Sequence, residues 1–224
     1  MRTRWRTRMV LGLIGIGLLG LALVGAYSAL QSEPSFYVEA LESPPANAEE
    51  AGEELERGVL ALHNDAHDAA TWSALFTDEQ VNGWLAVDLP EKVPQLLPSS
   101  VTDPRVHFAP GEARLGCRLA DSRLTSVVSV TVSIQLADEP NTLAVRIHGA
   151  WAGRLPLPLK RLLDQVREAA DRADVPLRWG QVDGDPVALI PLTDLSPLDG
   201  GRQPRLTHIE FGEGTLRLQG QTEP

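Results

Sequence analysis

Cysteine is nearly absent from this chain of 224 residues, since Cys117 is the only one. A single thiol cannot form an intramolecular disulfide, and it cannot supply a CxxC pair or a set of zinc-binding thiolates. In the stretch ARLGCRLA, Leu115, Cys117 and Leu119 alternate with arginines and a glycine, which is typical of a strand with the thiol turned inward. We expect a buried, unreactive cysteine.

Recognisable catalytic motifs are also lacking, because no GxSxG, P-loop or HExxH occurs. His63 and His67 are four residues apart, as metal ligands on a helix can be, but no spacing indicates a third ligand. Asp183 and Asp185 lie in the turn-like stretch QVDGDP, where aspartates usually bind their own backbone. We therefore expect no catalytic residue, metal site or cofactor. An enzyme acting on envelope polymers through these four residues is the minor alternative.

Positive charge is scarce beyond the first residues. The net charge is -10, and Arg2, Arg4, Arg6 and Arg8 are the only charges before Glu33, so the remainder is more acidic still. An acidic domain repels phosphate. Nucleic acid is therefore excluded as a main partner.

Charge is absent from Met9 to Leu30, which are rich in Leu, Ile, Val and Gly. At about 1.5 Å per residue, a helix of this length crosses the roughly 30 Å hydrocarbon core of a bilayer. The arginines before it place the N-terminus in the cytoplasm and the rest of the chain outside. AYSA at 26–29 would suit a signal peptidase, but the run exceeds an h-region of about 7–15 residues. We expect an uncleaved, single-pass anchor in the cytoplasmic (inner) membrane.

The chain then divides into three parts. Residues 1–30 are the Arg-rich start and anchor, residues 31–50 a proline-containing acidic stem, and residues 51–224 the extracytoplasmic domain. In that domain, apolar residues at helical spacing predict helices over 49–70 and from about 159 to 173. Thr77 and Gln80 form a capping-box pattern that begins a helix over 78–88.

Period-two alternation predicts long strands, most clearly over 124–136. In the next strand Ile147, Gly149 and Trp151 belong to the apolar face, opposite Arg146 and His148. One covered and one wet face indicate an antiparallel sheet. The expected fold class is α+β: an N-terminal transmembrane helix, then a curved antiparallel sheet of long strands packed against amphipathic helices.

Leucines spaced by prolines are the most distinctive feature, in LPEKVPQLLP (89–98) and GRLPLPLKRLL (153–163). Such segments leave apolar side chains in loops, and a groove can open there between sheet and helix. Plain closure of the core edge is the competing interpretation. The expected lining of the groove is Trp84, Leu85, Leu96, Leu97, Trp151, Leu155, Leu157 and Leu159.

Four features occur in a fixed order along the chain: FTDEQVNGWLA, VTDPRVHF, a pair of long alternating strands and AGRLPLPL. The same order is seen in the YpmS-like group of membrane-anchored extracytoplasmic proteins. The chain resembles that group over about residues 75 to 192. The group is in turn similar to the tubular lipid-binding (TULIP) architecture, a curved sheet around a long helix. This chain departs from it in its acidic excess and its short part after residue 192. The resemblance implies an extracytoplasmic carrier of an apolar ligand or an envelope assembly factor.

Two functions therefore stand as hypotheses. In the first, a membrane-anchored, non-enzymatic domain binds a lipid or other apolar ligand between sheet and helix. In the second, it is a protein-interaction or assembly module of a cell-envelope complex. The partners expected are the membrane through residues 9–30, a lipid or an envelope protein, and no nucleic acid.

Overall fold

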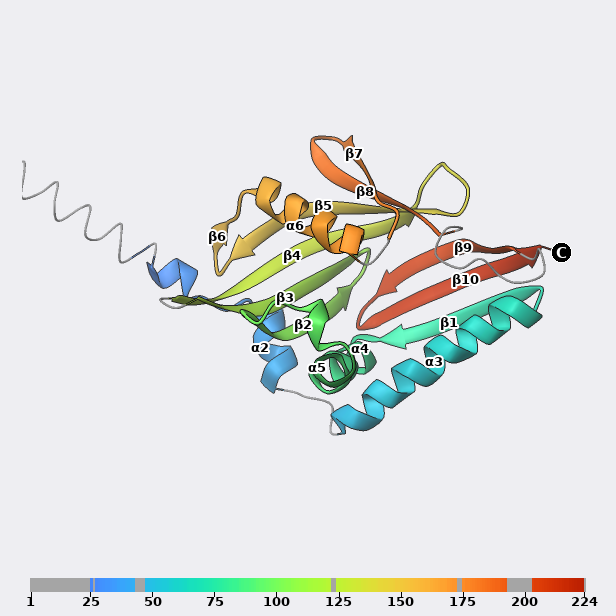
Figure 1. The fold of residues 1–224 in the computed structure, drawn as a ribbon, viewed down its shortest axis with the longest axis horizontal. Coiled ribbons are helices and arrows are strands. Elements are labelled where there is room, and N and C mark those ends of the chain that lie inside the picture. Colours follow the sequence, from blue (N-terminus) through green and yellow to red (C-terminus); the bar gives the residue numbers. More distant parts are fainter. Residues whose placement is uncertain are drawn as a thin grey trace, which may run out of the picture.

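The computed structural model describes residue 25 and residues 27–42, 47–121, 124–172, 175–192 and 203–223. Over these ranges the fold is α+β, with a large antiparallel sheet of long strands and few helices (Figure 1). The expected span over 9–30 lies outside the described residues except for its last few. None of the described helices is both long and apolar enough to cross a membrane.

The larger sheet has seven strands and is antiparallel throughout. The predicted strand 124–136 is confirmed as β4, which lies in the middle of the sheet between β3 and β5. The order is β2-β3-β4-β5-β8-β7, and β6 pairs with β5. The bounds are Val101–Ala109 for β2, Glu112–Asp121 for β3, Leu124–Leu136 for β4, Thr142–Ala152 for β5, Leu155–Pro156 for β6, Arg178–Val182 for β7 and Asp185–Pro191 for β8.

The smaller sheet has three strands, β1 (Thr71–Thr77), β10 (Thr215–Glu223) and β9 (Gln203–Gly212), in that order. The hairpin tips of the two sheets bind each other. Gly111 donates its N–H to the carbonyl oxygen of Phe211 at 3.0 Å, and Gly214 donates to Phe108 at 2.9 Å. The rings of Phe108 and Phe211 meet at 5.4 Å between centroids, so the core lies where the sheets join.

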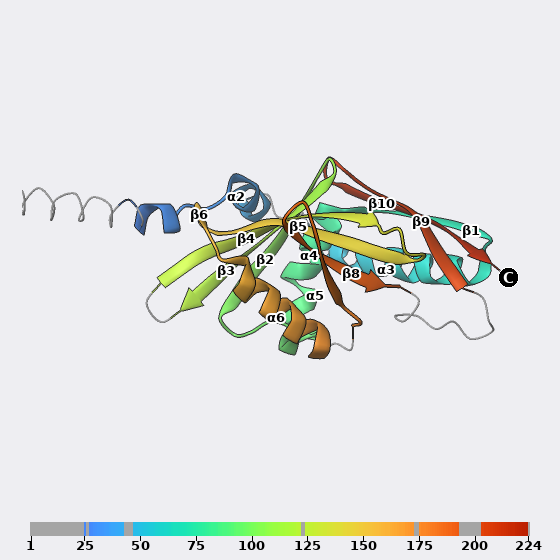
Figure 2. The ribbon, with the colours of Figure 1, turned by 90° about the horizontal axis from the view of Figure 1, so that it is seen from above.

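The helices are distributed over both sheets. Figure 2 shows α2 on one face of the larger sheet and α6, with α4 and α5, on the other. Helix α3 runs along the smaller sheet (Figure 1). The bounds are Ser35–Glu42 for α2, Ala48–Asp68 for α3, Asp78–Ala86 for α4, Asp88–Lys92 for α5, Pro94–Leu96 for the 3-10 helix η1 and Leu159–Arg172 for α6.

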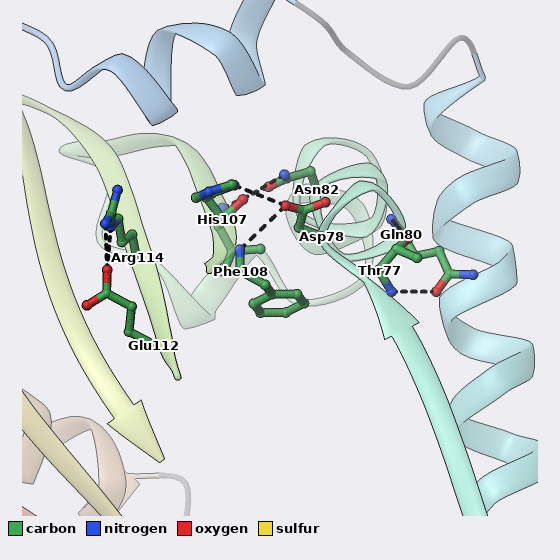
Figure 3. Close-up of polar contacts among 9 residues, drawn as sticks. Thr77, Asp78, Gln80, Asn82, His107, Phe108, Glu112 and Arg114 are labelled. Carbon is green, nitrogen blue, oxygen red and sulfur yellow. Dashed lines mark hydrogen bonds and ion pairs between the residues drawn. The ribbon is translucent and has the colours of Figure 1, made fainter. Parts of the chain in front are cut away.

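Helix α4 begins as the sequence predicts. The Thr77 hydroxyl accepts from the Gln80 N–H, and the Gln80 side chain accepts from the Thr77 N–H, both at 3.1 Å (Figure 3). The carboxylate of Asp78, in the first turn, lies 3.2 Å from His107 Nδ1 and accepts from the Phe108 N–H at 3.4 Å. These contacts fix the start of α4 against β2.

A one-residue bulge in β5 corrects the predicted faces of that strand. Val132 pairs with Ile147, but Thr131 pairs with Gly149, so His148 is the extra residue. Because side chains alternate between faces, one extra residue exchanges the faces of everything after it. Gly149 and Trp151 therefore share the face of Thr131 and Ser129, and the prediction that they face the core is wrong. Ala150 and Ala152 are buried on the apolar face instead.

Residues 31–42, expected to belong to a stem, are attached to the sheet. Helix α2 packs on the larger sheet where Gly116 leaves room for the rings of Phe36 and Tyr37. The Tyr37 side chain is 0% exposed, and its hydroxyl donates to the carbonyl oxygen of Asp103 at 2.9 Å. This segment is therefore part of the folded domain rather than a free spacer.

Candidate functional site

The apolar face of the larger sheet is closed at one end and open at the other. Along β3, Ala113 is 4% exposed, whereas Leu115 is 45% and Leu119 is 39% exposed. Cys117, between the two leucines, is partly buried, which differs from the full burial expected. Desolvation raises the pKa of the Cys117 thiol, which disfavours its thiolate form. The face points as the alternation predicts, but the helices cover only part of it.

We call the partly exposed part of this face, formed by Leu115, Cys117 and Leu119, the open strip. A groove lies beside it. It has a volume of about 340 Å³ and runs between α4, α5 and η1 on one side and the first half of β2 on the other. Its apolar lining includes Leu85, Leu89, Leu97 and Val101. Val101 is the cross-strand partner of Leu119, so the groove and the open strip are neighbours on one face. The volume lies within the range of about 300–1,000 Å³ typical of ligand sites.

Helix α6 forms the opposite border of the strip. Leu159, Leu162 and Leu163 pack against the core cluster of the larger sheet. In β6, just before α6, Leu155 pairs with Ala152, which puts it on the same apolar face. The apolar surface therefore has β3 and β4 as its floor and α4–α5 and α6 as its two sides.

The predicted lining residues are only partly brought together. Leu85 and Leu97 line the groove, and Leu155 and Leu159 lie on the far side of the strip. Leu157 follows β6, where its N–H donates to the carbonyl oxygen of Ala150 at 2.8 Å. Of Leu96 the structure describes the backbone, in η1, and not the side chain.

The two tryptophans of the predicted lining lie elsewhere. Trp84 points toward α3, where its indole N–H donates to Glu56 at 3.1 Å. Trp151 lies on the opposite face of the sheet, over Gly149, where an added Cβ would be only 2.5 Å from the indole ring. Helical spacing did not show that Trp84 contacts α3 rather than the groove. Period-two alternation did not show the bulge that turns Trp151 to the other face.

Charged residues hold the groove-forming helices in place. Glu56 of α3 binds Lys92 of α5, and Lys92 also binds the buried Asp88 at 2.8 Å. Hydrogen bonds from Lys92 and Trp84 lower the pKa of Glu56. The helix pair α3–α4 is close because Gly83 packs against the backbone of Ala48. The wall that carries Leu85 and Leu97 is therefore tied to the rest of the domain.

The floor of the strip was not predicted as part of the site. Leu115 and Leu119 were assigned to the core. Leu89 belongs to the proline-spaced stretch 89–98, but neither Leu89 nor Val101 was among the expected lining residues. The signal available in the sequence was the apolar alternation of β3. Alternation gives the face of a side chain but not the extent to which helices cover it.

The wet face of the same sheet carries a polar cluster. Ser133 Oγ lies 2.9 Å from His148 Nε2, and His148 Nδ1 lies 3.4 Å from the carboxylate of Asp185. Arg146 binds that carboxylate at 2.8 Å and Asp183 at 3.3 Å, and the hydrogen bond from Arg146 lowers the pKa of Asp185. Asp183 and Asp185 flank Gly184 in the β7–β8 turn, as expected, but their side chains reach across to β5.

The three side chains are connected in the order of a serine–histidine–aspartate triad, but the serine is not accessible as it is in a catalytic triad. Ser133 is 8% exposed, and it lies in a strand paired on both sides. Backbone N–H groups inside a sheet are used by the ladder, whereas an oxyanion hole needs donors aimed at an open site. The geometry is that of a cross-strand hydrogen-bond network.

His63 and His67 lie on α3 with their rings 5.4 Å apart. Within the described ranges, no group of three or more His, Cys, Asp or Glu side chains could hold a metal ion. The pair therefore offers two ligands at most.

Comparison of the chain with protein-family models, with curated proteins and with solved structures finds no match.

Proposed function

We propose that the protein is a membrane-anchored extracytoplasmic, non-enzymatic protein that binds a lipid or a similar apolar chain between its larger sheet and the helices on its apolar face. The observation that carries this proposal is the fall in coverage along β3, from Ala113 at 4% exposed to Leu119 at 39%. Leu115 and Leu119, on one face of β3 and beside a mainly apolar groove, remain 45% and 39% exposed, which favours a surface that an apolar partner covers.

Burial of a hydrocarbon chain supplies the binding energy in this proposal. Each CH₂ moved from water into an apolar site contributes about 0.8 kcal/mol. Roughly ten such groups would contribute about 8 kcal/mol, before the cost of ordering the chain is subtracted. The groove lining is more apolar than polar, although it includes Ser99, Thr102, Asp103 and Arg105, so the apolar part of the ligand would supply most of the binding energy.

The test is native mass spectrometry of the full chain, extracted gently from its own membranes. We expect a discrete added mass that organic extraction removes. Leu115→Ser and Leu119→Ser should lose it, because a hydroxyl on the floor disfavours hydrocarbon. The matched control is Leu60→Ser on the outer side of α3, where the leucine is 60% exposed, and it should keep the added mass. A bare wild-type mass, or equal retention by the three variants, contradicts the proposal.

An interaction module of an envelope complex is the second candidate function. Its support is a different set of exposed apolar side chains: Val59 and Leu60 on α3 and Leu75 on β1 are each more than half exposed. Crosslinking in native membranes should then capture one defined protein through these positions. Loss of that crosslink in Leu75→Ser, with lipid content unchanged, would favour this function over the first.

A further inference from the structure

The chain is held against the larger sheet at the point where the expected anchor ends. The N–H of Arg154 donates to the carbonyl oxygen of Ala29 at 2.8 Å, and the Ser126 hydroxyl donates to that of Leu30 at 2.8 Å. Between these contacts lies Gly153, with φ +58, where a Cβ would be 2.3 Å from the Ala29 oxygen. The backbone of residues 29 and 30 therefore packs directly against Gly153, and a side chain at position 153 would collide with it.

The contacts continue along the next residues. Glu33 binds Arg118 at 2.9 Å, and the buried Tyr37 binds the backbone of Asp103. No free linker separates residues 29 to 37 from the sheet. The domain is therefore attached directly to residues 29 and 30, the last residues of the expected anchor.

Chain length puts this contact at the membrane surface. As the helix that the sequence predicts, the apolar run from Met9 to Leu30 would span about 33 Å, close to the roughly 30 Å of a bilayer core. The headgroup layer adds about 6 Å on each side. A sheet end that touches Ala29 and Leu30 then lies in that layer. Tyr27, 59% exposed, is of the residue type that favours this interface.

The surface at this end suits lipid headgroups. The chain turns from β5 into α6 over residues 154–160, and this turn includes the short strand β6 and the first residues of α6. It begins with Arg154 and ends with Lys160, both exposed, and half-buried leucines alternate with exposed prolines between them. Basic residues beside a membrane attract anionic headgroups by about 1 kcal/mol each. The positive charge of this turn contrasts with the net charge of -10 of the chain.

The open apolar strip reaches the same end. Leu119 pairs with Ser126, the residue that binds Leu30, and Val101 of the groove pairs with Leu119. We infer that this end of the larger sheet, from the turn at 154–160 to Leu119, rests on the outer surface of the membrane, and that the groove takes its lipid directly from the facing leaflet. The occupant of this surface is the bilayer that holds the anchor. The inference rests on the proposed function for what enters the groove.

The test places a fluorescent amino acid at exposed Pro156, in the turn, or at exposed Asp138, in the β4–β5 turn. Pro156 pairs with Trp151, which pairs with Ser129, so Asp138 lies nine residues further along β4 and beyond its end, about 30 Å away. The full chain is reconstituted in vesicles of phosphatidylethanolamine and phosphatidylglycerol that carry a quencher on the headgroup. We expect quenching at 156 to exceed that at 138 about fivefold or more. Equal quenching overturns the inference, and so does protection of position 156 by a second protein chain.

Gly153→Ala tests the role of the contact between Gly153 and residues 29 and 30. The new methyl group would collide with the carbonyl oxygen of Ala29, so the quenching at 156 should fall toward that at 138. Gly111→Ala is the matched control, because Gly111 also has a positive φ, +79, but has nothing within 4 Å of the added Cβ. It should leave the quenching unchanged. Unaltered quenching in folded Gly153→Ala would contradict the proposed role of this contact.

Native mass spectrometry of the same wild-type protein separates the two proposals. A bound lipid with position 156 in water overturns the inference and leaves the proposed function standing. Strong quenching at 156 without a bound lipid supports the membrane contact and contradicts the proposed function.

Discussion

The side-chain amide of Asn82 exchanges two hydrogen bonds with the backbone of Val106. Its Nδ2 donates to the Val106 carbonyl oxygen, and the Val106 N–H donates to its Oδ1, both at 2.8 Å. Val106 lies in β2, at the edge of the larger sheet, where none of the described strands pairs with its outward backbone groups. The amide takes the place of that strand and fixes α4, with Leu85, beside the groove.

Asn141 acts in the same way on the edge of the smaller sheet. Its amide donates to the carbonyl oxygen of Pro204 at 3.1 Å and accepts from the N–H of Leu206 at 3.2 Å. Both residues belong to β9. An asparagine amide, which has one donor and one acceptor side, thus satisfies an edge strand of each sheet.

We expect Asn82→Ala to lower the free energy of unfolding by about 2–4 kcal/mol, because it leaves a buried N–H and a buried carbonyl of Val106 without partners. Asn64→Ala, at an exposed position of α3, is the control and should change stability by less than about 0.5 kcal/mol. Urea unfolding of both variants provides the measurement. Similar small effects at the two positions would show that water replaces the amide on β2.

The fold could be predicted from the sequence wherever its cause is local. The capping box of Thr77 and Gln80 and the alternation of 124–136 act within a few residues, and both elements form as predicted. Strand β1 and helix α2 were missed because distant partners stabilise them. Strand β1 pairs with β10, almost 150 residues later, and α2 depends on the space above Gly116.

The candidate site was harder to predict because it depends on how far the helices cover the apolar face of the larger sheet and on one bulge in β5. Of the expected lining residues, Leu85 and Leu97 line the groove beside β2, and further lining residues come from the proline-spaced stretch at 89–98. Trp151 was misplaced because the extra residue His148 exchanges the faces of β5. Leu119 was missed because the apolar alternation of β3 predicts burial, whereas the side chain is 39% exposed.

Gly116 should be essential for docking of α2. In Gly116→Val the added Cβ would lie 2.8 Å from the ring of Tyr37 and 3.2 Å from that of Phe36. Overpacking of this kind costs about 1–3 kcal/mol. We expect residues 35–42 to lose protection from hydrogen exchange, measured by mass spectrometry.

Gly180→Val is the matched control, since both glycines lie in strands. The nearest atom to a Cβ at Gly180 is 3.9 Å away, and valine favours strands, so stability should stay the same or rise slightly. Unchanged exchange of residues 35–42 in Gly116→Val would mean that α2 does not depend on this contact.

Tyr37 should make stability depend on alkaline pH. Burial raises the pKa of Tyr37 to about 12, whereas a tyrosine in the unfolded chain titrates near 10. Between these values the folded protein keeps a proton that the unfolded chain has lost, so the free energy of unfolding falls as pH rises from about 10 to about 12. Below pH 10 this contribution is constant.

Tyr37→Phe isolates the effect, because lysines and arginines titrate equally in both proteins. At neutral pH the variant should be about 1 kcal/mol less stable, since the hydrogen bond to Asp103 is lost. The difference between the two proteins should shrink across the alkaline window, as followed by urea unfolding at several pH values. A constant difference from pH 9 to pH 12 would place the Tyr37 phenol in contact with water.

Ser133 should not react as a nucleophile despite its position beside His148 and Asp185. Its side chain is buried between paired strands, and Arg146 engages the Asp185 carboxylate that would orient the histidine. We expect a fluorophosphonate probe to leave the full chain unlabelled in mass spectrometry, while Ser133→Ala lowers stability by about 1 kcal/mol through loss of the bond to His148. A covalent adduct on Ser133 that disappears in folded His148→Ala would instead identify a hydrolase site on the wet face, and the non-enzymatic function proposed above would have to be abandoned.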